Sequence, residues 1–362
     1  MTGDSKMSKL ASKAPVIAVV RGFVLILLLA AVCLPAFAFD EDHRAPINGT
    51  TLHFRVRGAN KANPYLLILH GGPGVSAHMF YTWGASLEHN VNVVYLDQRG
   101  CGQSAHLSIT STAASTDDAV KDYTIANLVK DIEGVREFLK LDRWFVLGHA
   151  WGAMLGVEYA VSHPERVSGF VVMDGLISQP RSQDSIIDAL QAHYEKQRES
   201  SDRTKKSEAN SKLYTIQELR QTPASLGRMN LVSEMAGLLF ADLYFAHPSN
   251  AAAIEQAMVN ACKQYRVPEP DLFAGEPIVA LQTTERYASK DDTSLLKSIT
   301  SPTMIINGRQ DVVIPPVSAQ IIKSGIKGSQ LVLLDDCGHY PFIEQPARAA
   351  SAILDFVNQH PH

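Results

Sequence analysis

The chain has 362 residues, of which 46% are hydrophobic and 19% are charged, and these proportions are those of an ordinary globular protein with a large apolar core. This length allows one large α/β domain that carries an insertion, or two small domains. The formal net charge of -4, without a basic stripe, gives no reason to expect nucleic acid as a partner.

The N-terminal residues have the layout of a secretory signal peptide. A charge-free apolar run covers residues 22–39, and Ala36-Phe37-Ala38 is a small-x-small cleavage pattern; the preceding basic residues are Lys6, Lys9, Lys13 and Arg21. We therefore predict that residues 1–38 are a signal peptide and that the protein is exported, to the periplasm or outside the cell. An uncleaved membrane anchor over residues 16–39 is the alternative, because the apolar run is close to the lower limit of roughly 18 residues for a membrane span.

The next part of the chain alternates predicted strands and helices. Residues 47–57 alternate apolar and polar side chains around Asn48-Gly49, which predicts an antiparallel strand pair at a sheet edge. Continuous apolar runs predict strands buried on both faces at 65–69, 91–96, 144–147 and 167–173. Apolar residues at helical spacing predict a helix over 125–139. This alternation is typical of a mainly parallel, doubly wound sheet.

The alternation stops between residues 176 and 296, where the sequence is polar and helix-prone. Two further strands are predicted at 303–306 and 330–334, and a final amphipathic helix over 344–359. We therefore predict a doubly wound α/β core formed by residues 39–175 and 297–362, with residues 176–296 as an inserted helical lid. Such an insertion is expected to cover the carboxyl edge of the sheet, where ligands bind in folds of this kind.

The segment Gly148-His149-Ala150-Trp151-Gly152 lies between the predicted strand 144–147 and a helix-like stretch, 153–160. Strand, Gly-x-x-x-Gly, helix is the context of a nucleophile elbow, in which the central residue is raised above the sheet edge. In a serine hydrolase that residue is serine. Here it is Ala150, whose methyl group offers no nucleophilic atom.

Two later residues complete the chain order of an α/β-hydrolase triad. Asp311 follows the predicted strand 303–306, and His339 follows the strand 330–334. A hydroxyl needs a positioned imidazole as its base, and the imidazole needs a carboxylate to fix its tautomer and stabilise its cation. We therefore expect His339 to be the base and Asp311 the orienting acid.

Several motifs now point to one family: His70-Gly-Gly-Pro-Gly74, Asp97-Gln-Arg-Gly-Cys-Gly-Gln-Ser104, the elbow with its tryptophan, Gly308-Arg-Gln-Asp311 and Gly338-His339. In order and spacing, the chain resembles an α/β-hydrolase of the proline iminopeptidase family. The resemblance implies cleavage of an N-terminal residue, often proline, from a small-molecule or short-peptide substrate. It also implies an oxyanion hole made by the backbone N–H groups of Gly72 and Trp151, two dipoles aimed at the developing negative charge.

The chain departs from this family in two places. Ala150 indicates either a serine hydrolase disabled by a Ser-to-Ala change or a natural non-catalytic homologue that binds ligands. In the lid, family members offer a glutamate to the substrate ammonium shortly before a Tyr-Phe pair, and the comparable stretch here is 240–245. Asp242 or Glu234 are the candidates to replace it; without such a carboxylate, an esterase, lactonase or amidase activity is favoured.

No cofactor and no metal are expected. No pair of His or acidic residues has recognisable zinc spacing, and the glycine patterns of nucleotide-binding loops are missing from the sequence. The membrane is expected as a partner only through the N-terminal segment, if it is not cleaved.

Overall fold

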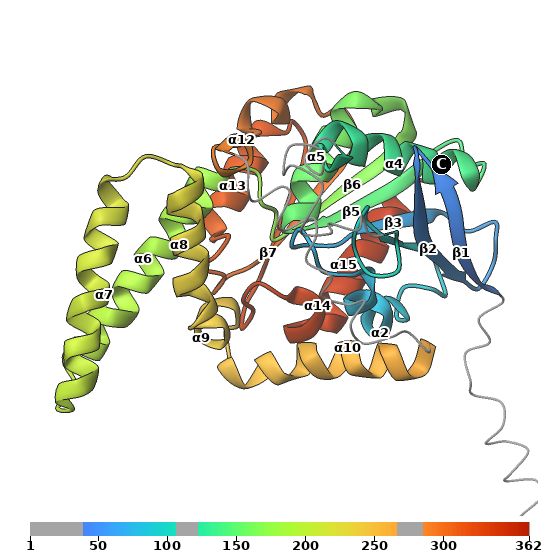
Figure 1. Cartoon of the computed structure of the whole chain (residues 1–362). Helices are drawn as coiled ribbons and strands as arrows, with labels where there is room; N and C mark the ends of the chain where they lie inside the picture. Colours follow the sequence, from blue (N-terminus) through green and yellow to red (C-terminus); the bar gives the residue numbers. More distant parts are fainter. Residues whose placement is uncertain (1–38, 106–121, 266–284, 362) are drawn as a thin grey trace, which may run out of the picture. The chain divides into compact units, whose positions relative to one another are not determined.

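Eight strands form one sheet in the computed structural model, which describes residues 39–105, 122–265 and 285–361 (Figure 1). Their order in the sheet is β1-β2-β4-β3-β5-β6-β7-β8. β2 pairs antiparallel with β1 and β4, and every other pair in the sheet is parallel. The predicted mainly parallel sheet is thereby confirmed, and the strands are β1 (Phe39–Ile47), β2 (Thr50–Gly58), β3 (Tyr65–Leu69), β4 (Asn92–Asp97), β5 (Trp144–His149), β6 (Val167–Met173), β7 (Thr303–Gly308) and β8 (Gln330–Leu334).

The predicted edge hairpin is present, and its first strand is longer than expected. Asn48 and Gly49 have φ values of 46° and 75°, so both turn residues are in the left-handed region that Asn and Gly tolerate. β1 starts at Phe39, well before the predicted start at Ile47.

The site is expected where the order of the strands reverses. β3 lies between β4 and β5 in the sheet, although the chain runs β3, β4, β5. In open α/β sheets, ligands bind in the crevice outside the carboxyl ends of the strands at such a point. The loop that begins at His70 follows β3, and Ala150 follows β5, so both lie at this crevice.

Helices cover both faces of the sheet, each with its own apolar cluster. α4 (Ile125–Phe138), α5 (Trp151–Ser162) and α13 (Pro316–Gly325) pack on one face, with Leu67 and Leu69 of β3. The other face carries Leu66 and Ile68; the elements packed there are η1 (Ala77–Phe80), α2 (Tyr81–Gly84), α10 (Ala251–Tyr265), α14 (Pro341–Glu344) and α15 (Pro346–Gln359). Adjacent residues of β3 thus serve opposite faces, as strand geometry requires.

The stretch between β6 and β7 is helical in its described part, as predicted. Its helices are α6 (Gln179–Arg198), α7 (Arg203–Gln221), α8 (Leu226–Gly237), α9 (Phe240–Tyr244), α10 and α12 (Glu285–Ala288), with short 3-10 turns η3 (Pro248–Asn250) and η5 (Thr293–Ser298). α6 and α7 pack side by side, and α8 packs against α6 (Figure 1). α10 contacts η1 and α2 instead, so it covers a face of the sheet.

The predicted signal peptide, residues 1–38, lies outside the described residues. In the ranges that the structure does describe, no helix has both the length and the apolarity needed to cross a membrane.

Candidate active site

The turn at Ala150 has the geometry of a nucleophile elbow. Ala150 has φ 48° and ψ -117°, between the end of β5 and the first residue of α5. A Cβ on Gly148 would collide with the backbone of Gly152 and Ala153, and one on Gly152 would collide with the carbonyl of Leu69. Both glycines are therefore required for strand and helix to approach so closely.

His339 and Asp311 form a buried acid–base pair. His339 Nδ1 lies 2.8 Å from Asp311 Oδ2, and both side chains are buried. Asp311 Oδ1 accepts backbone N–H bonds from Val313 (2.8 Å) and Ile314 (2.9 Å), which fix the carboxylate. Because Nδ1–H donates to Asp311, the lone pair of the neutral ring is on Nε2, the atom that a general base uses.

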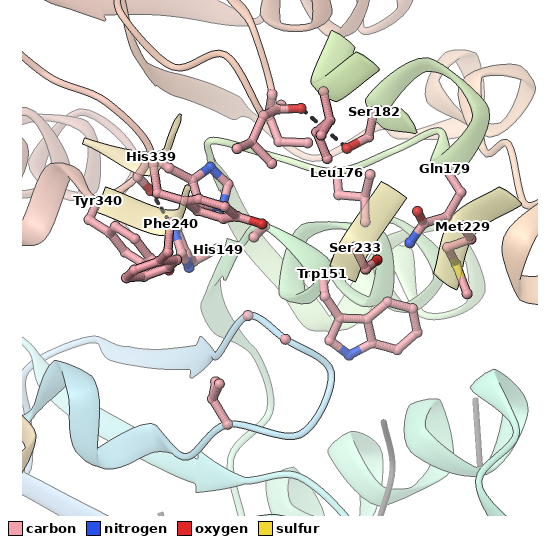
Figure 2. Close-up of a pocket in the computed structure, with 18 of the residues that line it drawn as sticks. His149, Trp151, Leu176, Gln179, Ser182, Met229, Ser233, Phe240, His339 and Tyr340 are labelled. Atoms are coloured by element: carbon pink, nitrogen blue, oxygen red, sulfur yellow. Dashed lines mark hydrogen bonds between the residues drawn. The ribbon is translucent and has the colours of Figure 1, made fainter. Parts of the chain in front are cut away.

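Ala150 and His339 line the same cavity, whose volume is about 280 Å³ (Figure 2). Core loops contribute one wall of this cavity, and lid helices contribute the other. The lining residues are Gly71, Gly72, Val75, Met79, His149, Ala150, Trp151, Leu176, Gln179, Ser182, Ile186, Met229, Ser233, Phe240, Tyr244, Tyr287, Val313, Ile314, His339 and Tyr340. Most of these residues are apolar or aromatic, and polar side chains are contributed by His149, Gln179, Ser182, Ser233 and His339, so the cavity offers both polar and apolar surface.

The two predicted oxyanion donors border this cavity. Gly72 has φ 107°, and a Cβ there would stand 2.7 Å from the Gly74 nitrogen, so the loop requires glycine. Trp151 is the first residue of α5, and its N–H has no partner inside the helix. The amide of Gly72 lies in the loop that follows β3 and that of Trp151 at the start of α5, which follows β5; the two strands are neighbours in the sheet.

Gln98 connects the loop that follows β3 to the start of α5. It accepts a hydrogen bond from Trp151 Nε1 (3.0 Å) and donates Nε2 to the carbonyl of His70 (2.8 Å). His70 Nδ1 also bonds the carbonyl of Gly71 (2.9 Å), so His70 holds its own loop. Arg99 donates to the carbonyl of Asn48 (2.9 Å) and pairs with Asp131, which the sequence did not predict.

His149 is a buried, uncharged residue that supports the loop of His339. Its Nε2 donates to the backbone carbonyl of His339 (2.9 Å, dashed in Figure 2). Burial, together with the nearby His339 and His70, lowers the pKa of His149 to about 3. The ring is therefore uncharged at neutral pH and cannot compete with His339 for a proton.

The lid carboxylates considered from the sequence lie outside the cavity lining. Glu234 and Asp242 are both exposed, whereas their neighbour Ser233 faces the cavity. The 240–245 stretch contributes differently: the carbonyl of Tyr244 accepts the N–H of His339 (2.8 Å). This stretch thus holds the histidine loop, a role that helical spacing could not show.

Asp174 is a site residue that the sequence reasoning missed. It follows β6 directly, and one oxygen of its carboxyl lies within 4.8 Å of the corresponding ligand atoms of Asp311 and His339. These three residues have the donor set of a metal site, but Asp311 and His339 already share a hydrogen bond. The sequence carries the same signal for Asp174 as for Asp311, because each is an acidic residue at the carboxyl end of a predicted buried strand.

A strand–elbow–helix turn, a buried Asp–His pair and a glycine loop at the carboxyl edge of a parallel sheet define the class of α/β hydrolases. Residues 64–346 match the alpha/beta hydrolase fold family, and the chain belongs to that family.

Proline iminopeptidases are among its relatives over most of its length. The chain is 27% identical over 335 residues to the proline iminopeptidase of Saccharolobus solfataricus, covering 88% of this chain and 93% of the relative. It is 25% identical over 333 residues to that of Lactobacillus helveticus, with 88% and 98% covered. The predicted resemblance to this family is thereby confirmed.

Several solved structures share the fold of this chain. A proline iminopeptidase-related protein of Thermus thermophilus superposes with a TM-score of 0.66 at 21% identity, over 89% of this chain and 98% of the other. The proline iminopeptidase of Mycobacterium smegmatis superposes with a TM-score of 0.58 at 20% identity, with 88% and 98% covered. At this level of identity the match establishes the shared fold.

Proposed function

We propose that the chain is a serine hydrolase of proline iminopeptidase type, in a form that Ala150 makes inactive. The observation that carries the proposal is the Asp311–His339 hydrogen bond of 2.8 Å at a cavity that also contains Ala150. Base, orienting acid and backbone donors are all in place around a position that lacks only a hydroxyl. The relatives named above favour a peptide substrate with a free N-terminus.

With serine at position 150, the reaction follows from these contacts. The hydroxyl oxygen attacks the scissile carbonyl carbon while His339 Nε2 takes its proton, and the N–H groups of Gly72 and Trp151 stabilise the oxyanion. The C–N bond then breaks as His339 returns the proton to the leaving amine, which leaves an acyl-enzyme ester. Water, deprotonated by His339, hydrolyses that ester and regenerates the hydroxyl. Asp311 keeps the imidazole oriented throughout.

The test is Ala150→Ser, assayed with prolyl-p-nitroanilide and with short p-nitrophenyl esters. We expect amide cleavage to appear, and the matched control Ala150→Ser/His339→Ala to abolish it. An Ala150→Ser protein that is folded but cleaves neither the anilide nor the esters would contradict the proposal.

Hydrolysis of an ester, lactone or non-peptide amide is the second candidate. It is favoured by the exposure of Glu234 and Asp242, which removes both candidate partners for a substrate ammonium from the described lining. Ester cleavage by Ala150→Ser without prolyl-p-nitroanilide cleavage would select it.

Ala150 itself supports a third candidate, a natural binding protein that uses the cavity without chemistry. This candidate requires an alanine codon at position 150 of the native gene, so the gene sequence decides against it if a serine codon is found.

The proposed export is tested separately: N-terminal sequencing of the protein from the periplasmic or secreted fraction should begin at Phe39.

A further inference from the structure

Asp174 stands at the junction of three strand ends. It follows β6 with φ 41°, and its N–H donates to the carbonyl of Ile306 on β7 (2.9 Å). Its Oδ1 accepts the N–H of Gly308 (2.9 Å), at the end of β7. Its neighbour Met173 accepts the N–H of Ala150 (3.1 Å). The side chain is therefore held rigidly between the elbow and the loop that carries Asp311.

The side chain of Asp174 lies near another carboxyl, that of Asp311, with one oxygen of each within 4.8 Å. The side chain is fully buried, and among the described residues Oδ2 has no hydrogen-bond partner. An ionised carboxylate cannot donate a hydrogen bond to Asp311, although their oxygens lie within 4.8 Å. A single proton on Asp174 would remove this deficiency, because Oδ2 could then donate to Asp311.

Electrostatics requires one of the two carboxyls to hold a proton. Two buried carboxylates this close cannot both ionise readily, and Glu344 nearby adds a further acidic group. The other titratable groups that face the pair are His339, Tyr244, Tyr340 and Cys337, whose thiol pKa is raised by burial and by Asp174. Among these described groups, only His339 can become a cation.

The hydrogen bonds decide which carboxyl is protonated. Among the described residues, Asp311 accepts from Val313, Ile314 and His339, whereas the Asp174 side chain accepts one hydrogen bond, from Gly308. Accepted hydrogen bonds favour the charged form of a carboxyl, so the negative charge belongs on Asp311 and the proton on Asp174.

We propose that Asp174 is a positioning residue that stays protonated at neutral pH and donates a hydrogen bond from Oδ2 to Asp311. The pair then carries one negative charge beside His339, held in place from the β6 side. Asp174 is also a reserve acid. When Asp311 loses its charge, Asp174 can release its proton and so provide the negative charge beside His339. Burial and Asp311, in that order, raise the pKa of Asp174 well above its ordinary value, which agrees with this assignment.

Infrared difference spectroscopy on the Ala150 protein tests the proton directly. The spectrum of the unsubstituted Ala150 protein minus that of Asp174→Asn should show the C=O band of a protonated carboxylic acid at pH 7. Asp335→Asn, which replaces an exposed aspartate, is the control and should show none. Asparagine suits position 174, because it tolerates positive φ and still donates to Asp311. In the Asp311→Asn background, the band should disappear at a lower pH. Absence of the band, or an unchanged midpoint in Asp311→Asn, would overturn the proposal.

A second measurement needs no substitution at 174. With aspartate labelled by ¹³C at the side-chain carboxyl, one resonance of the wild type should keep the protonated shift at pH 7, and its absence would also overturn the proposal.

A kinetic arm rests on the proposed function and uses Ala150→Ser as its parent. Asp311→Asn should retain at least about tenfold more activity than Asp311→Asn/Asp174→Asn, because a charge within this distance shifts an imidazole equilibrium by a unit or more. Equal activities would refute the reserve role. A silent parent would count against the proposed function alone, because the spectroscopic result does not depend on turnover.

Discussion

Ala150 keeps the backbone conformation of a nucleophile elbow without a nucleophile. Its φ of 48° and ψ of -117° lie in a region that residues with a Cβ rarely adopt, and such outliers cost of order 1–3 kcal/mol. The surrounding hydrogen bonds enforce it: Ala150 N–H donates to Met173, and Leu176 N–H donates to the carbonyl of Ala150. These hydrogen bonds therefore hold Ala150 in a strained backbone conformation, at a cost to the free energy of unfolding.

Replacement of Ala150 by glycine should stabilise the protein. Glycine removes the strain of the positive φ, and this gain exceeds the extra entropy of the unfolded chain, so the free energy of unfolding should rise by about 1 kcal/mol. Ala160→Gly, inside α5, is the matched control and should lower it by about 1 kcal/mol or more. Urea unfolding of both variants measures the effect. A loss of stability in both would show that the elbow is not strained.

At the residue scale, the positions Ala150, Asp311 and His339 could be predicted from the sequence. Each follows a predicted strand, and their order along the chain is that of an α/β-hydrolase triad. It missed Asp174 because closeness to Asp311 depends on β6 and β7 being neighbours in the sheet, which the order of residues does not state. The proposed lid roles of Glu234 and Asp242 could not be decided for a similar reason. Helical spacing shows which residues share a face, not which face turns toward the cavity.

At the scale of elements, the histidine loop is held by residues 244–250, between α9 and α10. Glu344 in α14 accepts hydrogen bonds from Gly338 N (2.6 Å), Ala246 N (2.9 Å) and Asn250 Nδ2 (3.2 Å). The carbonyl of Tyr244 accepts the N–H of His339. One carboxylate thus joins α14, the loop of His339 and the segment that follows α9.

Glu344→Gln should therefore loosen this junction. The substituted amide places an NH2 group against backbone donors and loses a charge-assisted bond, so we expect a loss of about 1–3 kcal/mol in the free energy of unfolding. Urea denaturation measures it, with Glu255→Gln on the exposed face of α10 as a control expected to change stability by less than about 0.5 kcal/mol. Equal effects of the two substitutions would mean that the junction contributes nothing.

Strands β3 and β6 were predictable because they are mainly apolar and almost fully buried, and the predicted ranges 65–69 and 167–173 match them in full. The predicted range 330–334 also matches β8, an edge strand that is recognised by its four apolar residues although it is only partly buried. β1 was partly missed because residues 40–44 are a run of five charged or polar residues, Asp-Glu-Asp-His-Arg, without the alternation that predicts a strand. The position of α10 against η1 and α2 was also not predictable, because an amphipathic pattern does not name its partner.

At the scale of the whole molecule, a buried histidine ties the N-terminal hairpin to the rest of the sheet. His53 on β2 bonds Asp97 Oδ2 (2.7 Å) at the end of β4 and Asp42 Oδ1 (2.8 Å) on β1. Asp97 Oδ1 in turn accepts from Ser76 Oγ (2.9 Å) and Ala77 N (2.9 Å), beyond the glycine loop. Burial alone would lower the pKa of His53, but the bonds to Asp42 and Asp97 outweigh it and raise the pKa to about 9.

This histidine should stabilise the fold most in neutral and acid solution. Its folded pKa of about 9 exceeds the unfolded value of 6.5, so the contribution is complete below pH 6.5 and is lost as the pH rises through 9. The difference in unfolding free energy between wild type and His53→Gln should therefore shrink by up to about 3 kcal/mol over that range. Urea unfolding at a series of pH values measures it; a difference that stays constant would refute the charged state of His53.

The contribution of His149 to stability should have the opposite pH dependence to that of His53. Its folded pKa of about 3 lies below the unfolded 6.5, so between these values the unfolded chain binds a proton that the native state does not. Compared with His149→Gln, whose amide can still donate to the carbonyl of His339, the wild type should lose about 1.4 kcal/mol per pH unit as the pH falls from 6 to 5. The same unfolding series measures it. Parallel curves would mean that His149 is protonated in the fold, and a charge beside His339 would then oppose its role as a base.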